Sequence, residues 1–321
     1  MSIYRSVRSI AGASGDAIVD WDAVRTAAKS ATTPGRIELT DDERAAYAAD
    51  VREARNAIQT AADITFDLPD TIEIQHRHHW IDQNATTFQR VMQPLEARVQ
   101  PSGAMSDAAR IINTGSMSLT LGFLAQNVLG QYDPLLLAEQ PDADHGLYFV
   151  HPNIEAAAIE LAVDFDRFRR WIAFHEVTHA AEFALAPWLP EYLTDRLTEG
   201  VEHLSAGTLD RVAFQELQTA MTAVEGYAEL VMDAAFDDDP SDLRERLDAR
   251  RQNAGPISAL LRRVLGLNMK RQQYERGRAF FETVVDDRGL QAATAVWERP
   301  ETLPRDAEFE HPKRWLSRVD P

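Results

Sequence analysis

The chain has 321 residues, of which 45% are apolar and 26% are charged, and its formal net charge is −18. This composition is typical of a globular protein and excludes disordered, collagen-like and low-complexity classes. The sequence also has no cysteine, which excludes disulfides, thiolate zinc sites, iron–sulfur clusters and a cysteine nucleophile. Any bound metal ion must therefore be held by His, Asp and Glu side chains.

Most of the predicted elements are helices. A capping box at Thr40 begins an alanine-rich helix that ends near residue 65. Helical periodicity returns at residues 80–99, 104–129, 166–186, 209–236 and 268–287. Pro94 should kink or end the first of these. Strand patterns are short and occur at 71–74 and 147–150, so we expect a mainly α fold with a few short strands.

No internal repeat or long linker divides the sequence, so we expect one domain over residues 1–321. It would comprise an N-terminal helical lobe at about 1–160 and a second lobe at 161–321, around an active-site cleft. The N-terminal segment lacks the apolar run of a signal peptide. The uncharged stretch at 111–132 is long enough to cross a bilayer, but its polar side chains favour a buried helix and no membrane association.

The acidic excess comes from 28 Asp and 23 Glu against 30 Arg and only three Lys. Such a surface repels nucleic acid and anionic lipid, so we expect neither as a partner. Replacement of Lys by acids keeps a protein hydrated at high salt, where self-repulsion is screened. We therefore interpret the chain as a halophilic, cytoplasmic protein; an ordinary acidic protein is the alternative. The acids at 237–239 should face water and not bind an ion.

The most informative motif is His175-Glu176-x-x-His179, an H-E-x-x-H pattern. On a helix, residues four apart share a face, so both imidazoles can reach one zinc ion. Glu176 then points at the fourth, water-occupied position, where it can act as general base. The helix is apolar nearly all round, which indicates burial. Buried His and Glu need partners, and a metal ion would supply them; hydrogen-bonded core histidines are the alternative.

A third protein ligand is required, and we predict Glu225 on the second metal-binding helix. Glu225, Glu229 and Asp233 form a row of acids at spacing four, which suggests a nearby cation; a solvated acidic face is the alternative. Gly226 would leave room for the two metal-binding helices to approach. Glu229 would accept the second ring N–H of a ligating His, or exchange roles with Glu225. His203 is the competing third ligand, because three-His zinc sites exist.

A second histidine cluster occurs at His76-Arg77-His78-His79. Adjacent side chains diverge on a strand or a helix, so only His76 and His78 could share a strand face. We therefore interpret this cluster as ordinary loop chemistry and not as a second metal site.

The sequence resembles a family of zincin-like proposed hydrolases, formerly a domain of unknown function, that is associated with deazaflavin coenzyme biosynthesis in actinobacteria and haloarchaea. The similarity extends over about residues 20–319. Its recognisable stretches are Trp80 with Asn84 and Phe88, 129–133, 150–153, 171–189, 225–233, 255–256 with 265–267, and Trp297 with 300–304. The resemblance implies a mostly helical, zincin-like fold and a zinc site, without an established substrate.

The segment that begins at Glu225-Gly226 is also similar to the Asn-Glu-Gly-Phe-Ala segment of gluzincin aminopeptidases, in which the Glu binds zinc. This similarity favours Glu225 over Glu229 as the ligand. The spacing departs from that group, because Glu225 follows His179 by 46 positions. The intervening residues 188–210 would then be an insertion that roofs the cleft.

The leading hypothesis is a zinc-dependent hydrolase, specifically a metallopeptidase, in which Glu176 takes a proton from water and passes it to the leaving amine. The substrate would be a peptide or a small amide. Tyr192, Tyr227 and His203 are candidate donors to the oxyanion. The strand at 147–150 could pair with an extended substrate.

Two rival functions stay open at this point. The zinc could be structural, in a non-catalytic partner of coenzyme biosynthesis enzymes; four protein ligands on the metal would favour this role. Alternatively, the enzyme could be an amidohydrolase of a small metabolite, which a narrow closed pocket would favour.

Overall fold

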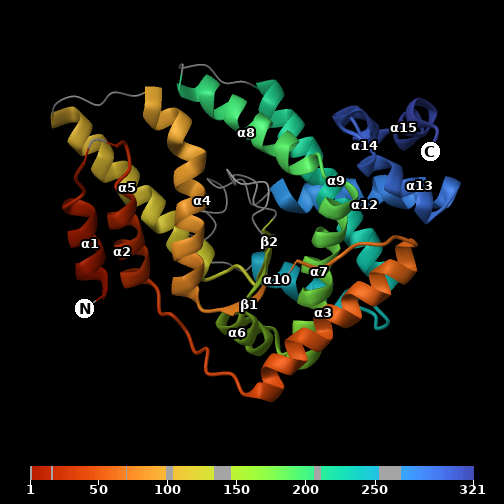
Figure 1. Cartoon of the computed structure of the whole chain (residues 1–321), viewed down its shortest axis with the longest axis horizontal. Helices are drawn as coiled ribbons and strands as arrows, with labels where there is room; N and C mark the ends of the chain where they lie inside the picture. The colour runs from red at the N-terminus through yellow and green to blue at the C-terminus, as the bar shows by residue number, and fades with distance from the viewer. Residues whose placement is uncertain are drawn as a thin grey trace.

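Helices make up most of the computed structural model, which describes residues 2–15, 17–69, 71–98, 104–133, 146–205, 211–252 and 269–321 (Figure 1). The helices of the first half are α1 (Ser2–Ala11), α2 (Trp21–Ala31), α3 (Asp41–Ala62), α4 (Arg77–Arg98), α5 (Ala104–Ala125) and α6 (His151–Leu161). Those of the second half are α7 (Phe165–Leu185), α8 (Leu189–Ser205), α9 (Arg211–Ala235), α10 (Ser241–Gln252), α12 (Met269–Arg288), α13 (Leu290–Thr294), α14 (Asp306–Glu310) and α15 (Pro312–Val319). The predicted mainly α fold is confirmed. The family-like stretches at 255–256 and 265–267 lie outside the described residues.

Helix α3 begins with the predicted capping box. The Thr40 hydroxyl accepts a hydrogen bond from the Glu43 main-chain N–H at 3.2 Å, and the Glu43 carboxylate accepts one from the Thr40 N–H at 2.6 Å. These two bonds satisfy amides that have no partner inside the helix. By contrast, α4 continues past Pro94 to Arg98, so the helix does not end at the proline. It packs against α2, α5 and α8, and these contacts support it despite the missing N–H.

The sheet has three short strands, β1 (Thr71–Gln75), β2 (Gly130–Asp133) and β3 (Gly146–Val150), in the order β1-β3-β2. β3 pairs in parallel with β1 and antiparallel with β2. Because both edges of β3 are occupied, the prediction that residues 147–150 pair with a substrate is wrong. β2, which the sequence pattern did not indicate, is the strand that contacts α7.

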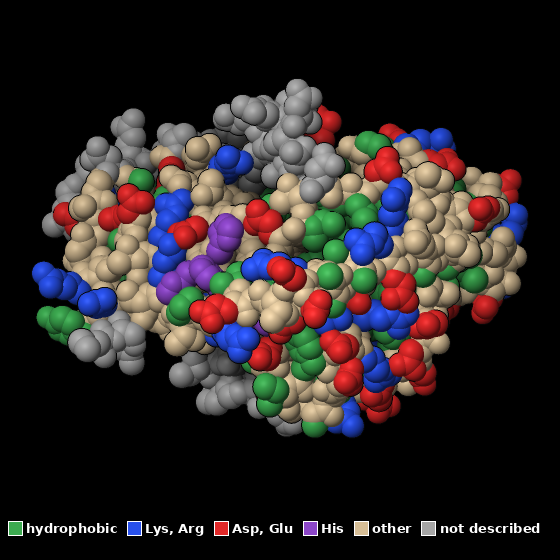
Figure 2. Space-filling model, turned by 60° about the horizontal axis from the view of Figure 1, so that its bottom comes forward, with side chains coloured by type: hydrophobic (Ala, Val, Ile, Leu, Met, Phe, Trp, Pro, Cys, Tyr) green, Lys and Arg blue, Asp and Glu red, His purple; other side chains and the backbone are tan. Residues whose placement is uncertain are grey.

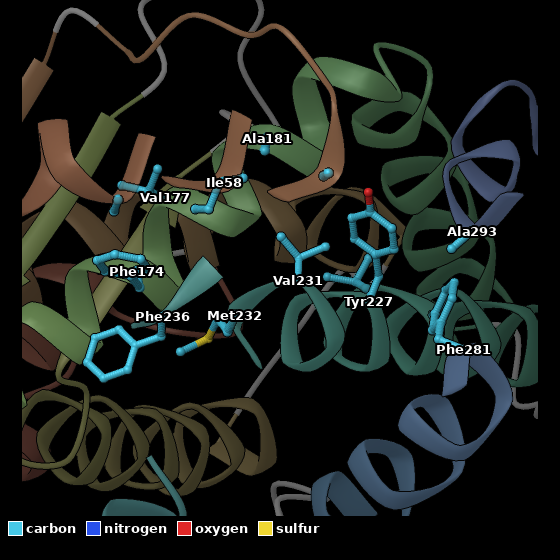
Figure 3. Packing of buried hydrophobic residues seen from close by; sticks show 14 of the residues in the cluster. Ile58, Phe174, Val177, Ala181, Tyr227, Val231, Met232, Phe236, Phe281 and Ala293 are labelled. Atoms are coloured by element: carbon cyan, nitrogen blue, oxygen red, sulfur yellow. The ribbon is translucent and has the colours of Figure 1, made fainter. Parts of the chain in front are cut away.

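Two hydrophobic clusters form the core among the described residues. The smaller packs α2, α4 and α5 around Trp80, Ile81 and Leu121. The larger joins α3, α6, α7, α9 and α12 to the C-terminal helices. Figure 3 shows part of it, where Phe174 of α7 meets Phe236 edge to face at 5.0 Å. The two helices that carry the candidate metal ligands are thus both anchored in the larger cluster.

The uncharged stretch at 111–132 forms most of α5 and then β2. We predicted a buried helix, but α5 is buried on one side only. Thr114 and Ser118 lie inside, whereas Ile112 is 66% and Leu119 62% exposed. None of the described helices combines the length and apolarity needed to cross a membrane.

The acids at 237–239 are exposed, as predicted, and two of them also form ion pairs with α7. Asp237 contacts Arg170 at 2.6 Å, and Asp238 contacts Arg167. Arg167 also donates to Asp242 of α10. We call Arg167 and Arg170 with these acids the arginine clamp. It ties the start of α7 to the turn between α9 and α10, and Figure 2 shows the wider interleaving of acidic and basic side chains on one face.

Gly226 allows two helices to cross closely, but the partner of α9 at this crossing is not the predicted helix. A methyl group at Gly226 would lie 2.4 Å from the main-chain carbon of Gly277 on α12, and one at Gly277 would lie 2.3 Å from the carbonyl oxygen of Thr222. The crossing therefore joins α9 to α12, not α9 to α7. Successive residues are about 100° apart on a helix, so when Glu225 faces α7 its neighbour faces elsewhere.

Replacement of Gly226 or Gly277 by Ala should therefore lower the free energy of unfolding, because the added methyl meets backbone that cannot move aside. Overpacking of this kind costs about 1–3 kcal/mol or more. Urea unfolding measures the change. Gly122→Ala on α5 is the matched control, since its methyl would find its nearest neighbour at 3.5 Å. Equal stability of Gly226→Ala and Gly122→Ala would contradict the account.

Candidate metal centre

Helix α7 carries the H-E-x-x-H motif at the centre of the larger core. The helix begins at Phe165, where the Asp164 carboxylate accepts a hydrogen bond from the Arg167 main-chain N–H at 2.8 Å. Phe168 and Phe174 are fully buried, so α7 is enclosed as its composition predicted. His175, Glu176 and His179 therefore project from a helix whose position is set by packing on several sides.

The two imidazoles of the motif point at one place. The Nε2 atoms of His175 and His179 lie 3.3 Å apart, with the ring planes at 76°. Two nitrogens bound at about 2.0–2.1 Å to a tetrahedral ion would be about 3.3–3.4 Å apart. A hydrogen bond between two ring nitrogens would normally be shorter. The spacing therefore matches a pair of ligands to one metal ion.

Glu225 of α9 completes a group of three. One ligand atom from each of His175, His179 and Glu225 lies within 4.8 Å of the others. Glu225 is only 4% exposed, and α9 contacts α7 along the core. The structure thus brings together the two histidines and the acid that the sequence singled out. His203 lies exposed on α8 and is outside this group.

Glu182, which the sequence analysis did not consider, contacts the second ring nitrogen of His179. The Nδ1 atom of His179 lies 2.7 Å from Oε2 of Glu182, and Glu182 is fully buried. A proton held on Nδ1 leaves the Nε2 lone pair directed at the cluster. The spacing in the sequence could have predicted this contact, because an acid three positions after a histidine shares its helix face.

Glu229 was predicted for that second-ring contact, and the structure places it elsewhere. Its carboxylate forms an ion pair with Arg244 of α10 at 3.0 Å. Four residues advance a helix by about 6 Å along its axis, which separates Glu229 from Glu225. Burial raises the pKa of Glu229, and Arg244 opposes that shift.

The charges around His179 favour a cation. Burial alone would lower the pKa of His179, but the carboxylates of Glu182, Glu225 and Glu176 raise it to about 9. Burial also raises the pKa of Glu182 to about 7, although the imidazole of His179 opposes the shift. Burying several carboxylates together is costly unless positive charge is close. Oxygen and imidazole donors that surround one point fit a divalent ion such as zinc.

Glu176 lies beside the group and touches β2. It is 6% exposed, and its Oε2 atom accepts a hydrogen bond from the Tyr132 main-chain N–H at 2.9 Å. The ring of Tyr132 packs against Phe183, one turn beyond His179, with the ring centres 5.3 Å apart. Glu176, the predicted general base, is therefore in direct contact with the edge strand β2.

The two tyrosines among the candidate oxyanion donors have different surroundings. Tyr227 is fully buried and packs edge to face against Phe281 and Trp297, so its hydroxyl does not face an open cleft. Tyr192 is half-buried on α8. Helix α8 contacts both α4 and α9 (Figure 1), and it occupies the segment predicted to roof the cleft.

The second histidine cluster makes local hydrogen bonds. Nδ1 of His76 accepts a bond from the His79 main-chain N–H at 3.0 Å, and Nε2 of His78 lies 2.7 Å from the Thr32 carbonyl oxygen. Within the described ranges, the group of His175, His179 and Glu225 alone has the geometry to hold a metal ion with three such side chains.

Comparison with known proteins agrees with this geometry. The profile of a family described as zincin-like metallopeptidase matches residues 19–210 and 201–316. The chain belongs to this zincin-like metallopeptidase family. It is also similar to a crystal structure of a candidate hydrolase with a novel fold from Chloroflexus aurantiacus, at 31% identity and a TM-score of 0.76. That match covers 94% of this chain and 99% of the other. A search of curated proteins found no match.

If the group holds a divalent metal ion, the substitution Glu182→Gln should weaken the binding of added zinc by about 10- to 100-fold, because partners of a ligating histidine set its tautomer and basicity. Competition with a chromophoric chelator measures the affinity. Glu229→Gln is the matched control: it also removes a partly buried carboxylate, but one that pairs with Arg244. Equal losses in the two variants would contradict a specific role for Glu182.

Proposed function

We propose that the protein is a zinc-dependent peptidase in which His175, His179 and Glu225 hold the metal and Glu176 is the general base. The 3.3 Å separation of the two Nε2 atoms, with Glu225 in the same group, is the observation that carries this proposal. Membership of the zincin-like metallopeptidase family supports the peptide as substrate class. The buried Glu182 supports the assignment because it orients His179.

Bound zinc supplies Lewis-acid chemistry, which polarises a carbonyl and lowers the pKa of water towards about 7. The chain's own residues supply the proton transfers. Glu176, next to His175 on the same helix, takes a proton from the attacking water and gives it to the nitrogen of the leaving amine. The Tyr132 N–H holds one oxygen of Glu176, which leaves the carboxylate oriented for this transfer.

A catalytic metal is favoured over a structural one. Structural zinc sites are closed by four protein ligands, whereas catalytic sites have three and an open position. The group found among the described residues has three members. With these three ligands, the fourth position of a tetrahedral zinc would be left for water on the side of Glu176.

Strand β2 is a better candidate than β3 for the strand that lies beside a bound peptide. Its neighbour β3 is paired on both sides, whereas β2 pairs with β3 alone among the described strands. β2 also contacts α7, which carries Glu176. A peptide bound at the metal cluster would run beside β2 without pairing along its outer edge, because the Tyr132 N–H there is already bonded to Glu176.

Substitution Glu176→Gln should lower the rate of peptide hydrolysis by about 10²–10⁴-fold while zinc remains bound, because it removes only the proton acceptor. A peptide-library digest at high salt, with zinc content measured in parallel, tests this. The control is Glu245→Gln, which changes an exposed acid of α10. Unchanged hydrolysis in Glu176→Gln, or full activity after removal of zinc by a chelator, would contradict the proposal.

A further inference from the structure

The edge of β2 that does not face β3 lies against Glu176. In the β2–β3 pair, Gly130 is opposite Phe149 and Tyr132 is opposite Leu147. The Val150 N–H donates to the Leu129 carbonyl. Alternate residues of an antiparallel strand bond to the partner, so Leu129 and Gln131 direct their main-chain groups at β3. Gly130 and Tyr132 direct theirs outward, and the bond from Tyr132 N–H to Glu176 agrees with this pattern.

Gly130 leaves space that the carboxylate of Glu176 fills. A methyl group at Gly130 would lie 2.6 Å from Cγ, 2.6 Å from Oε1 and 2.8 Å from Cδ of Glu176. All three of its nearest neighbours thus belong to one flexible side chain. This differs from Gly226, whose nearest neighbours are main-chain atoms of another helix. A methyl at Gly130 would consequently displace the carboxylate and leave the backbone in place.

We infer that β2 positions the general base: the Tyr132 N–H fixes one carboxylate oxygen of Glu176, and Gly130 provides the space in which the carboxylate lies. This inference rests on the proposed function, because it assigns positioning groups to the same reaction. Gly130 and Tyr132 act through Glu176 and do not themselves touch the reacting atoms.

The arrangement has a physical purpose. A glutamate side chain has three rotatable bonds, and a shift of about 1 Å in a catalytic group can cost about 10²-fold in rate. A hydrogen bond at one oxygen and close packing around the rest restrict those rotations. Because the edge of β2 also borders the proposed substrate site, the same strand fixes the position of the general base relative to the main chain of the substrate.

The first test is Gly130→Ala. We expect kcat to fall by about 10²-fold, with KM and zinc content within about threefold of the wild type, since only the base is displaced. Gln131→Ala is the matched control on the same strand. Its side chain accepts a hydrogen bond from Trp80 Nε1 at 2.8 Å, away from Glu176, so kcat should change by less than about threefold.

The second test distinguishes positioning from general damage to the strand. Aspartate is one methylene shorter than glutamate, so it can lie beneath the added methyl. The factor by which Glu176→Asp lowers kcat should therefore be at least about tenfold smaller in the Gly130→Ala background than in the wild type. Equal costs in both backgrounds would mean that the two positions act independently, and would overturn the inference.

The third test does not depend on catalysis. Selective ¹⁵N labelling of the seven tyrosines gives few enough amide signals to follow individually, and Tyr132→Phe assigns the signal of interest. Amide hydrogen exchange at Tyr132 should accelerate by at least about tenfold in Gly130→Ala and in Glu176→Ala. Other tyrosine amides should keep their wild-type exchange rates.

The outcomes separate the two proposals. If no peptide is cleaved but Tyr132 exchange accelerates, the proposed function fails and the positioning contact stands. If wild-type protein cleaves peptides and Gly130→Ala matches it in kcat, the hydrolase stands and the positioning role is overturned. Unchanged Tyr132 exchange in both variants overturns the positioning role regardless of activity.

Discussion

The burial of several carboxylates beside two imidazoles, between α7 and α9, is the constraint on which the centre of this structure depends. Glu176, Glu182 and Glu225 are each less than a tenth exposed. Ionised carboxylates at such depth are costly without nearby positive charge. The facing Nε2 atoms of the histidines mark where that charge belongs. The same constraint explains the raised pKa of His179, because a proton there offsets part of the negative charge.

The positions of these groups are set by packing along the two helices. The arginine clamp ties the start of α7 to the turn after α9. Within α9, the crossing at Gly226 brings α12 close enough for its backbone to contact α9. Between these points, Phe174 and Phe236 pack edge to face. Sites built on packed helices hold their side chains more precisely than sites on loops.

Patterns local in sequence predicted the parts of this arrangement that local physics controls. The capping box at Thr40 depends on residues three apart, and the histidine pair depends on residues four apart. Only His, Asp or Glu could complete the group, but the row of acids left Glu229 as an alternative to Glu225, and the similarity to the gluzincin segment favoured Glu225. What the sequence could not provide was orientation between elements. β2, with the sequence Gly-Gln-Tyr-Asp, shows neither an apolar run nor an alternating pattern, and the partner of Gly226 is 51 positions away on another helix.

The arginine clamp and the Gly226 crossing, which hold α7 and α9 in place, affect how such a protein can evolve. The clamp and the glycine crossing involve none of the three proposed ligands, so a descendant that loses a histidine keeps the contacts that hold α7 and α9 in place. Fold and chemistry are then inherited separately. Relatives can share these helices in superimposable positions and differ in whether, and on what, they act.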